Sequence, residues 1–178
     1  MRLAVSTQGN RLGVALYVRN DRFDVEAASI FRLPRSLHDR LMASADDRLV
    51  GARLRDRDTG KAIVVGSLHA TLLTDPNIMR RWQVDSAHFQ LQAFAPGLPL
   101  LVAGDYNYPF FTGQLHRHLR RRGFSLGRSG TSTYRKRGIM GGSFDLASSH
   151  NSDLLDVVTL PQGASDDPPI RVSARYSH

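Results

Sequence analysis

Two polar side chains suited to phosphate chemistry follow a short apolar run near the middle of the chain. The four residues between Pro99 and Gly104 are apolar and predict a buried strand, and Gly104 permits a turn after it. Asp105 and Asn107 follow, and because alternate residues of an extended chain point the same way, both can face one site. A carboxylate binds cations and an amide donates hydrogen bonds. The alternative interpretation is an ordinary strand-ending turn capped by these residues.

A histidine ends the preceding apolar strand. Residues 62–69 predict a second buried strand whose last residue is His69. There an imidazole can bind a phosphate oxygen or protonate a leaving group, although surface and core histidines are equally common. A helix over 77–94 follows and is stopped by Pro96 and Gly97. Apolar residues at helical spacings predict its buried face: Met79, Trp82, Phe89 and Ala93.

Basic residues gather in the last third of the chain. The chain carries a formal net charge of +8, and no Asp or Glu lies between Asn107 and Ser143. This distribution predicts salt-dependent binding to the phosphates of nucleic acid. The alternative is a solvated helix face in an arginine-rich composition. The predicted nucleic-acid-binding residues are Arg117, Arg120, Arg121, Arg122, Arg128, Arg135, Lys136 and Arg137.

Length and composition set further bounds. The 178 residues, 41% of them hydrophobic, predict a single domain over 1–178 with a true core. No apolar run is long enough to cross a membrane and no signal-peptide pattern is present, so we expect a cytoplasmic protein without a membrane partner. The absence of cysteine excludes disulfides and thiolate chemistry. Oxygen and imidazole ligands remain for any metal site.

The order of elements favours an α+β architecture. Strands are expected over 12–19, 23–30 and 47–55, and the polar segment 55–60 predicts a hairpin into the strand that ends at His69. A second helix is expected over 112–122, whereas the proline-containing segment 162–169 is expected to be a loop. A hairpin implies antiparallel pairing, so the sheets are expected to be largely antiparallel.

The order strand, His69, helix, strand, Asp105-x-Asn107 resembles the endonuclease/exonuclease/phosphatase superfamily with its DNase I-like fold. The resemblance continues through Gly130–Tyr134, Ser143–Leu146 and Tyr176–His178. It implies a four-layer αββα sandwich of two mixed, largely antiparallel sheets flanked by helices, incomplete at the N-terminal strand.

The resemblance also implies a function. It predicts a metal-dependent phosphoesterase, most simply a nuclease that hydrolyses DNA or RNA, with Mg²⁺ or Mn²⁺ held by Asp105 and Asp145. His69 and Asn107 would bind the developing charge. His178 resembles the family's general base, with Asp105 as the other candidate.

Two positions depart from the family pattern. The family's metal-binding Glu lies on an early strand, but none of the residues before Gly13 is Glu. Ser177 replaces the Asp that would orient the histidine after it. These departures motivate two alternatives: a non-catalytic nucleic-acid-binding or interaction protein on a degenerate version of the fold, and a partner chain that completes the sheet.

Overall fold

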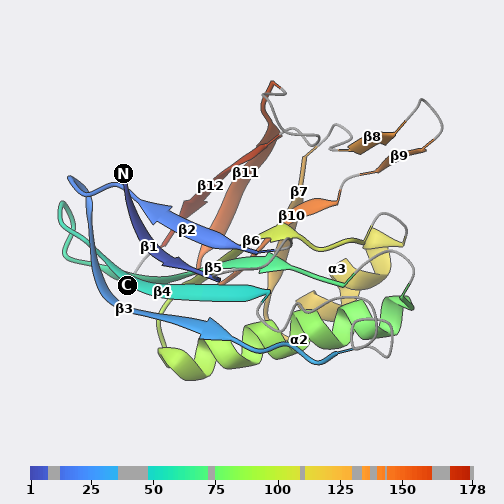
Figure 1. Cartoon of the computed structure of the whole chain (residues 1–178), viewed down its shortest axis with the longest axis horizontal. Helices are drawn as coiled ribbons and strands as arrows, with labels where there is room; N and C mark the ends of the chain where they lie inside the picture. Colours follow the sequence, from blue (N-terminus) through green and yellow to red (C-terminus); the bar gives the residue numbers. More distant parts are fainter. Residues whose placement is uncertain are drawn as a thin grey trace.

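The computed structural model describes residues 1–7, 13–35, 48–71, 75–108, 111–129, 134–136, 140–142, 144–161 and 169–176. Its centre is a six-stranded mixed sheet (Figure 1). In spatial order the strands are β3 (Phe23–Phe31), β4 (Leu49–Asp56), β5 (Ala62–His69), β6 (Leu100–Asp105), β10 (Asp145–His150) and β7 (Ser125–Arg128). Only β5 and β6 pair in parallel among these neighbours.

The strand predictions hold closely for β3, β4, β5 and β6. The predicted hairpin also forms, because the Asp56 amide donates to the Lys61 carbonyl at 2.8 Å and β4 runs antiparallel to β5. The predicted strand over 12–19 is shorter, as β2 (Ala15–Val18), and residue 12 lies outside the described residues. A strand that the sequence analysis did not predict, β1 (Arg2–Ser6), pairs with β2.

Two helices cover one face of the six-stranded sheet. α2 (Asn77–Phe94) has the predicted bounds, and α3 (Thr112–Arg120) is slightly shorter than expected. Leu91 of α2 is fully buried and fits against two facing glycines. A Cβ atom at Gly51 or Gly66 would come within 2.3 Å or 2.7 Å of its methyl groups. The two glycines therefore let α2 pack close to β4 and β5.

The buried face of α2 differs from the predicted one. Trp82 and Phe89 are 57% and 72% exposed, whereas Gln83 and His88 are buried. Gln83 accepts from the Thr71 amide and donates to a loop carbonyl, and His88 is hydrogen-bonded to Ser148 on β10. The prediction was wrong because it weighed hydrophobicity alone. On the side of α2 that packs against the sheet, polar side chains also fit, because they form hydrogen bonds with buried polar groups there.

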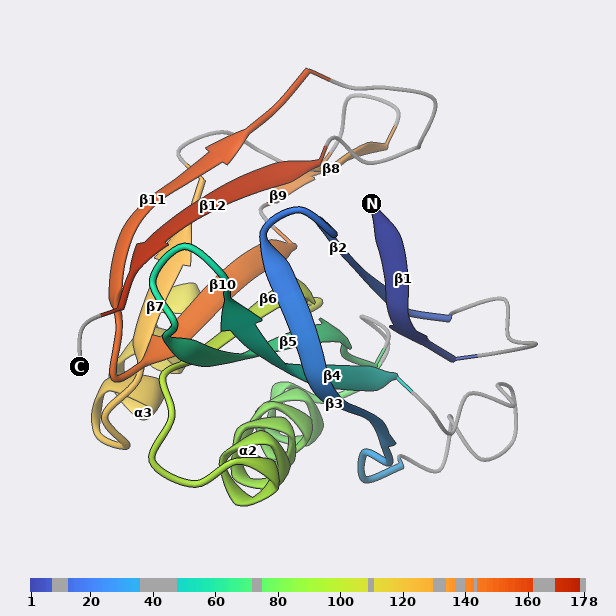
Figure 2. The ribbon, with the colours of Figure 1, turned by 90° about the vertical axis from the view of Figure 1, so that its left-hand side faces the viewer.

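Two hairpins lie on the opposite face of the sheet (Figure 2). One is β1–β2, which lies over β3, β4 and β5; the other pairs β11 (Asp153–Thr159) with β12 (Ile170–Arg175) and packs by β11 on β7 and β10. A small hairpin of β8 (Tyr134–Lys136) and β9 (Met140–Gly142) extends from one end. Among the described residues, both helices lie on one side, and no helix covers the outside of the hairpins.

No helix in the described part of the chain is long and apolar enough to cross a membrane.

Candidate active site

Three adjacent strands bring three predicted site residues into one row. His69 is the Cα partner of Asp105 across the parallel pair β5–β6, and Asp105 is the Cα partner of Asp145 across β6–β10. Partner residues on neighbouring strands share a face, so the imidazole and both carboxyl groups project toward the hairpin side. His69 Nε2 lies 3.8 Å from Asp105 Oδ2. The row forms one edge of the sheet where β5 and β6 end.

Gly104 makes the turn that presents this row. Its φ is +145°, and a Cβ atom there would lie 2.0 Å from the carbonyl oxygen of Leu68 on the neighbouring strand. Only glycine fits this close approach. Asn107 also has a positive φ, +47°, and its amide N–H donates to Asp105 Oδ1 at 2.7 Å. The turn contact of the alternative interpretation is therefore present at Oδ1, while Oδ2 is the atom nearer His69.

The side chain of Asn107 is held by the backbone that follows the neighbouring strand β5. Its Nδ2 donates to the carbonyl oxygen of Ala70 at 3.2 Å, and the residue is buried. A primary amide carries two N–H donors, so the second can serve a ligand. The backbone at Ala70 is itself held in place, because the Ala70 amide donates to the Asp105 carbonyl at 2.7 Å.

His69 is neutral at physiological pH. Burial lowers its pKa below the ordinary value of 6.5, and the nearby positive charge of Arg48 lowers it further. The 3.8 Å separation from Asp105 exceeds a hydrogen bond and does not reverse this effect. The lowered pKa favours the neutral form of His69, which lies close to Asp105 without a hydrogen bond to it.

Two buried arginines beneath the site were missed by the sequence analysis. Arg48 is 2% exposed, and its Nη1 donates to the same Ala70 carbonyl at 3.4 Å. Arg80, at the start of α2, is 5% exposed and lies 5.9 Å from the ring centroid of Tyr108. Burial lowers the pKa of Arg80 from its usual value. Their sequence neighbours carry no pattern that separates them from the many exposed arginines.

The carboxylates fit part of a site for a hard cation. Mg²⁺ prefers oxygen ligands and is commonly held by one or two carboxylates, with waters and substrate phosphates completing its shell. Asp105 and Asp145 provide such a pair from adjacent strands. In the described part of the chain, no group of three or more His, Asp or Glu side chains is arranged to hold a metal. The described residues thus place two carboxylates side by side at this edge, and a cation held there would need further ligands.

Three of the predicted nucleic-acid-binding arginines lie far from the carboxylates. The His150 ring is hydrogen-bonded to the Gly123 carbonyl at 2.9 Å, which places the end of α3 at the far end of β10 from Asp145. At a strand rise of about 3.3 Å per residue, β10 separates these ends by about 16 Å. Arg120 at the end of α3, and Arg121 and Arg122 after it, therefore lie at that far end, and their role in binding nucleic acid stays a prediction. Arg122 instead pairs with Asp85 on α2 at 2.8 Å.

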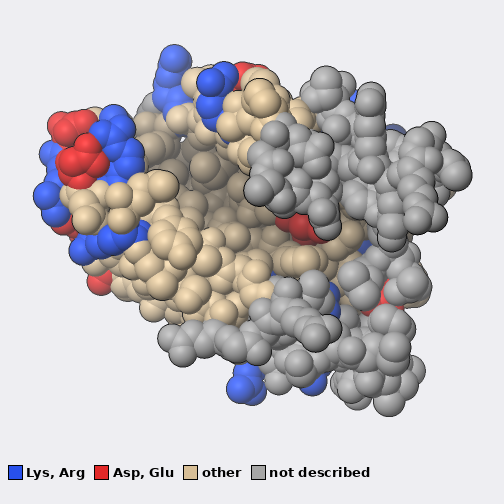
Figure 3. Space-filling view, turned by 45° about the horizontal axis from the view of Figure 1, so that its top comes forward, with Lys and Arg blue, Asp and Glu red and all other residues tan. Residues whose placement is uncertain are grey.

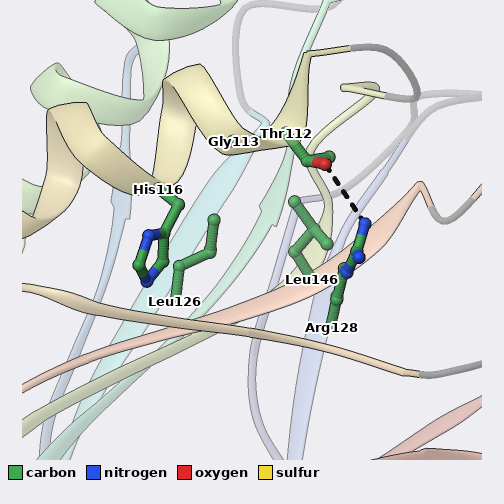
Figure 4. Close-up of a pocket in the computed structure, with 6 residues that line it drawn as sticks. All are labelled: Thr112, Gly113, His116, Leu126, Arg128 and Leu146. Atoms are coloured by element: carbon green, nitrogen blue, oxygen red, sulfur yellow. Dashed lines mark hydrogen bonds between the residues drawn. The ribbon is translucent and has the colours of Figure 1, made fainter.

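Arg128 lies at the site end of the sheet but on its helical side. It is the Cα partner of Leu146, and its Nη1 donates to Thr112 Oγ1 at 3.3 Å. Arg128 and Thr112 line a cavity of about 220 Å³ together with His116 of α3. Figure 4 shows these three side chains. The exposed Arg117 also belongs to α3. For Arg135 and Lys136 the structure describes only the backbone of β8, and Arg137 and His178 lie outside the described residues.

Comparisons with known proteins identify the family. The model of the Endonuclease/Exonuclease/phosphatase family matches residues 3–167. The chain therefore belongs to this family, and the predicted resemblance is confirmed. A comparison with curated proteins gave no match.

Solved structures share the fold at low identity. A mannosyl-6-phosphatase from Bacteroides thetaiotaomicron aligns with a TM-score of 0.70 and 14% identity, over 92% of this chain and 71% of that one. The human Nocturnin catalytic domain with bound sulfate gives 0.65 and 17%, over 90% and 64%. TDP2 from D. rerio complexed with single-strand DNA product gives 0.65 and 13%, over 92% and 72%. The predicted class of mixed sheets with few helices is thereby confirmed.

Proposed function

We propose that this protein hydrolyses phosphoester bonds, that its substrate is the phosphodiester backbone of DNA or RNA, and that Mg²⁺ or Mn²⁺ is required. The observation that supports the proposal best is the row of His69, Asp105 and Asp145 across three adjacent strands. Three polar residues facing one side at a strand edge, next to the ordered amide of Asn107, form a compact set for binding a phosphate and a cation.

The charge of the row is the reason for a metal requirement. Two carboxylates side by side repel a phosphate anion, and His69 is neutral and does not offset them. A divalent cation held by Asp105 and Asp145 would neutralise phosphoryl oxygens and lower the pKa of a bound water.

The other residues would bind and orient the phosphate. His69 Nε2 and the second N–H of Asn107 are placed to bind phosphoryl oxygens as charge develops. Burial, and then the nearby charge of Arg48, lowers the pKa of His69, and the Ala70 carbonyl accepts hydrogen bonds from both Arg48 and Asn107. The attacking water would lose its proton to Asp105 or to His178, the two bases that the family resemblance suggests.

Nucleic acid is the preferred substrate class because of charge. The chain carries a net charge of +8, and five of its predicted phosphate-binding arginines lie on α3, the turn after it or β7: Arg117, Arg120, Arg121, Arg122 and Arg128. A polymer longer than the roughly 16 Å that separates these ends of β10 could contact both regions, whereas a small phosphomonoester could reach only one. The neighbour TDP2, solved with a single-strand DNA product, is consistent with this substrate.

The test is cleavage of supercoiled plasmid, single-stranded DNA and RNA by the purified protein with Mg²⁺, Mn²⁺ or EDTA. Asp105→Ala is the site variant, and Asp156→Ala, on an exposed position of β11, is the matched control. Metal-dependent cleavage that is lost only in Asp105→Ala supports the proposal. Cleavage that persists in Asp105→Ala removes this residue from the mechanism.

One observation favours a second candidate, a non-catalytic nucleic-acid-binding protein. Within the described residues, no group of three or more metal-ligating side chains is arranged around a cation. Tight, salt-sensitive DNA binding without cleavage under any metal would support this candidate and contradict the hydrolase.

A further inference from the structure

One peptide group behind the candidate site is held from both sides. It joins Ala70 to Thr71, directly after the end of β5. Its carbonyl oxygen accepts hydrogen bonds from Asn107 Nδ2 at 3.2 Å and from Arg48 Nη1 at 3.4 Å. Its N–H, which belongs to Thr71, donates to Gln83 Oε1 of α2 at 2.7 Å. Both residues of this peptide are fully buried, so water does not compete for these contacts.

The two ends of this peptide group cannot turn independently. A peptide group is planar, and in its trans form the N–H and the carbonyl oxygen point in opposite directions. The acceptor that fixes the direction of the N–H therefore also fixes the direction of the carbonyl oxygen. A peptide turned over would present its N–H to the Asn107 amide, and a donor would then face a donor. Gln83 and Asn107 are thus linked through one rigid group of atoms.

The side chain of Gln83 is itself fixed by the fold. It is 1% exposed, and its Nε2 donates to the Pro34 carbonyl at 2.8 Å. Because Oε1 accepts on the other side, only one orientation of the amide satisfies both partners. Gln83 shares a face of α2 with Ala87 and Leu91 at four-residue spacing, and Leu91 fits against the two glycines of β4 and β5. This close packing brings the amide of Gln83 within reach of the peptide.

Gln83 cannot touch a substrate at the site. The row of His69, Asp105 and Asp145 projects toward the hairpin side of the sheet, whereas α2 covers the other side. Figure 3 shows the hairpin side, with a hollow and acidic side chains at one end of it. Any influence of Gln83 on the site must therefore pass through other residues.

We propose that Gln83 is a positioning residue for the candidate active site. Through the Ala70–Thr71 peptide it holds the carboxamide of Asn107 in the orientation that leaves the second N–H for a phosphate oxygen. The inference rests on the proposed role of Asn107 in binding phosphate. Arg48 also donates to the same carbonyl, so removal of the Gln83 acceptor weakens the positioning of Asn107 without abolishing it.

The first test is nuclear magnetic resonance of two matched variants, Gln83→Met and Gln90→Met. Gln90 lies on the same helix, and its Nε2 donates to the carbonyl of Arg32 in the same loop, but it has no contact with the peptide behind the site. In Gln83→Met alone, we expect the side-chain amide signals of Asn107 to shift and the Thr71 amide to lose its protection from hydrogen exchange. Unchanged signals in Gln83→Met, or equal changes in Gln90→Met, overturn the proposal.

The second test is a double-mutant cycle on phosphate binding. The probe is inorganic phosphate, titrated calorimetrically in the presence of Mg²⁺. Gln83→Met and Asn107→Ala should each raise its Kd by about tenfold, and the double variant should bind no more weakly than Asn107→Ala, because both changes break one chain of contacts. A merely structural role of Gln83 predicts additive losses instead, and additivity overturns the proposal.

A third variant separates the acceptor from the packing of the side chain. Gln83→Glu keeps an oxygen for the Thr71 amide, and its protonated form can donate to the Pro34 carbonyl. It should retain phosphate affinity within about threefold, and a loss as large as that in Gln83→Met overturns the proposal.

The remaining outcomes are also distinguishable. Gln83→Met leaves a buried N–H without its acceptor, so its melting is recorded by circular dichroism. If it does not fold, hydrogen exchange of the unmutated protein decides, because rapid exchange of the Thr71 amide overturns the proposal by itself. Absence of hydrolysis by the unmutated protein contradicts only the proposed function, since the Asn107 signals report positioning without turnover.

Discussion

The two faces of the central sheet are built for different purposes. The helical face is closed, with Leu91 fitted against Gly51 and Gly66. The hairpin face leaves Val65 and Leu101 half-buried, and it carries the row of His69, Asp105 and Asp145 at one edge. The helical face thus carries the tightly packed core, and the hairpin face carries the candidate site. Alternate residues of a single strand, such as β6, can therefore serve the two purposes separately.

The largest effect on the hairpin face is expected from Asp105→Asn. Loss of one carboxylate from the paired row should reduce metal-dependent hydrolysis by about 100-fold to 1,000-fold, because a hard cation loses a charged ligand. The unfolding free energy should change by less than about 1 kcal/mol, since the asparagine oxygen can still accept from the Asn107 amide. Kinetic assays and urea unfolding of the same sample check both parts. Unfolding of the variant would mean that this face is also structural.

The converse change is Leu91→Ala on the helical face. Removal of this fully buried side chain should cost about 3 kcal/mol of unfolding free energy, because the rigid glycine-lined contact cannot collapse onto the cavity. Leu101→Ala, the same change on the hairpin face, should cost about 1 kcal/mol. Urea denaturation measures both. Equal losses would contradict the difference between the faces.

A pH dependence tests the closed face further. His88 of α2 is buried, stacks on Phe124 with ring centroids 4.0 Å apart, and has its pKa lowered to about 3 by burial. Between pH 6.5 and about 3 the unfolded chain therefore binds a proton that the folded chain does not, so stability falls as the pH falls. At pH 5 the loss from this residue should be about 2 kcal/mol relative to pH 7.

The matching variant is His88→Gln, measured by urea unfolding at pH 7 and pH 5. Glutamine removes the titrating ring but retains a donor for Ser148, so the acid loss should shrink although the variant is less stable at pH 7. The lowered pKa of His69 leaves a smaller residual loss of the same sign. An unchanged pH dependence would show that His88 does not titrate as the burial of its ring implies.

The smallest effect is expected at the far end of β10, away from the candidate site. Replacement of Arg120, Arg121 and Arg122 by Ala should weaken nucleic-acid binding and reduce the salt slope by about 1 to 2, at about 0.9 for each phosphate that is no longer neutralised. Arg122 contributes least because it pairs with Asp85. Hydrolysis of a small phosphodiester such as bis-p-nitrophenyl phosphate should not change, since these residues lie at the far end of β10. A salt slope equal to that of the parent would exclude them from the interface.

The sequence predicted the elements of this fold well where the pattern is local. The strands ending at His69 and Asp105, the hairpin after β4 and the bounds of α2 all follow from short apolar runs, turn residues and helical spacing. Which side of α2 is exposed could not be predicted in this way. Trp82 and Phe89 match the helical spacing as well as the residues that are buried do. Tertiary contacts decide which face turns inward: the hydrogen bonds of Gln83 and His88 and the fit of Leu91 against the glycines of β4 and β5.

For the candidate site, the residue types and the turn follow from the sequence alone: Gly104 is needed for a φ of +145°, and Asp105 and Asn107 follow it at fixed spacing. The rest depends on tertiary structure. Strand register brought His69 and Asp145 to Asp105, and the burial of His69, with Arg48 nearby, lowers the pKa of His69. The difference is one of range: turn geometry and apolar alternation act between sequence neighbours, whereas register and burial are set by packing between residues far apart in the chain.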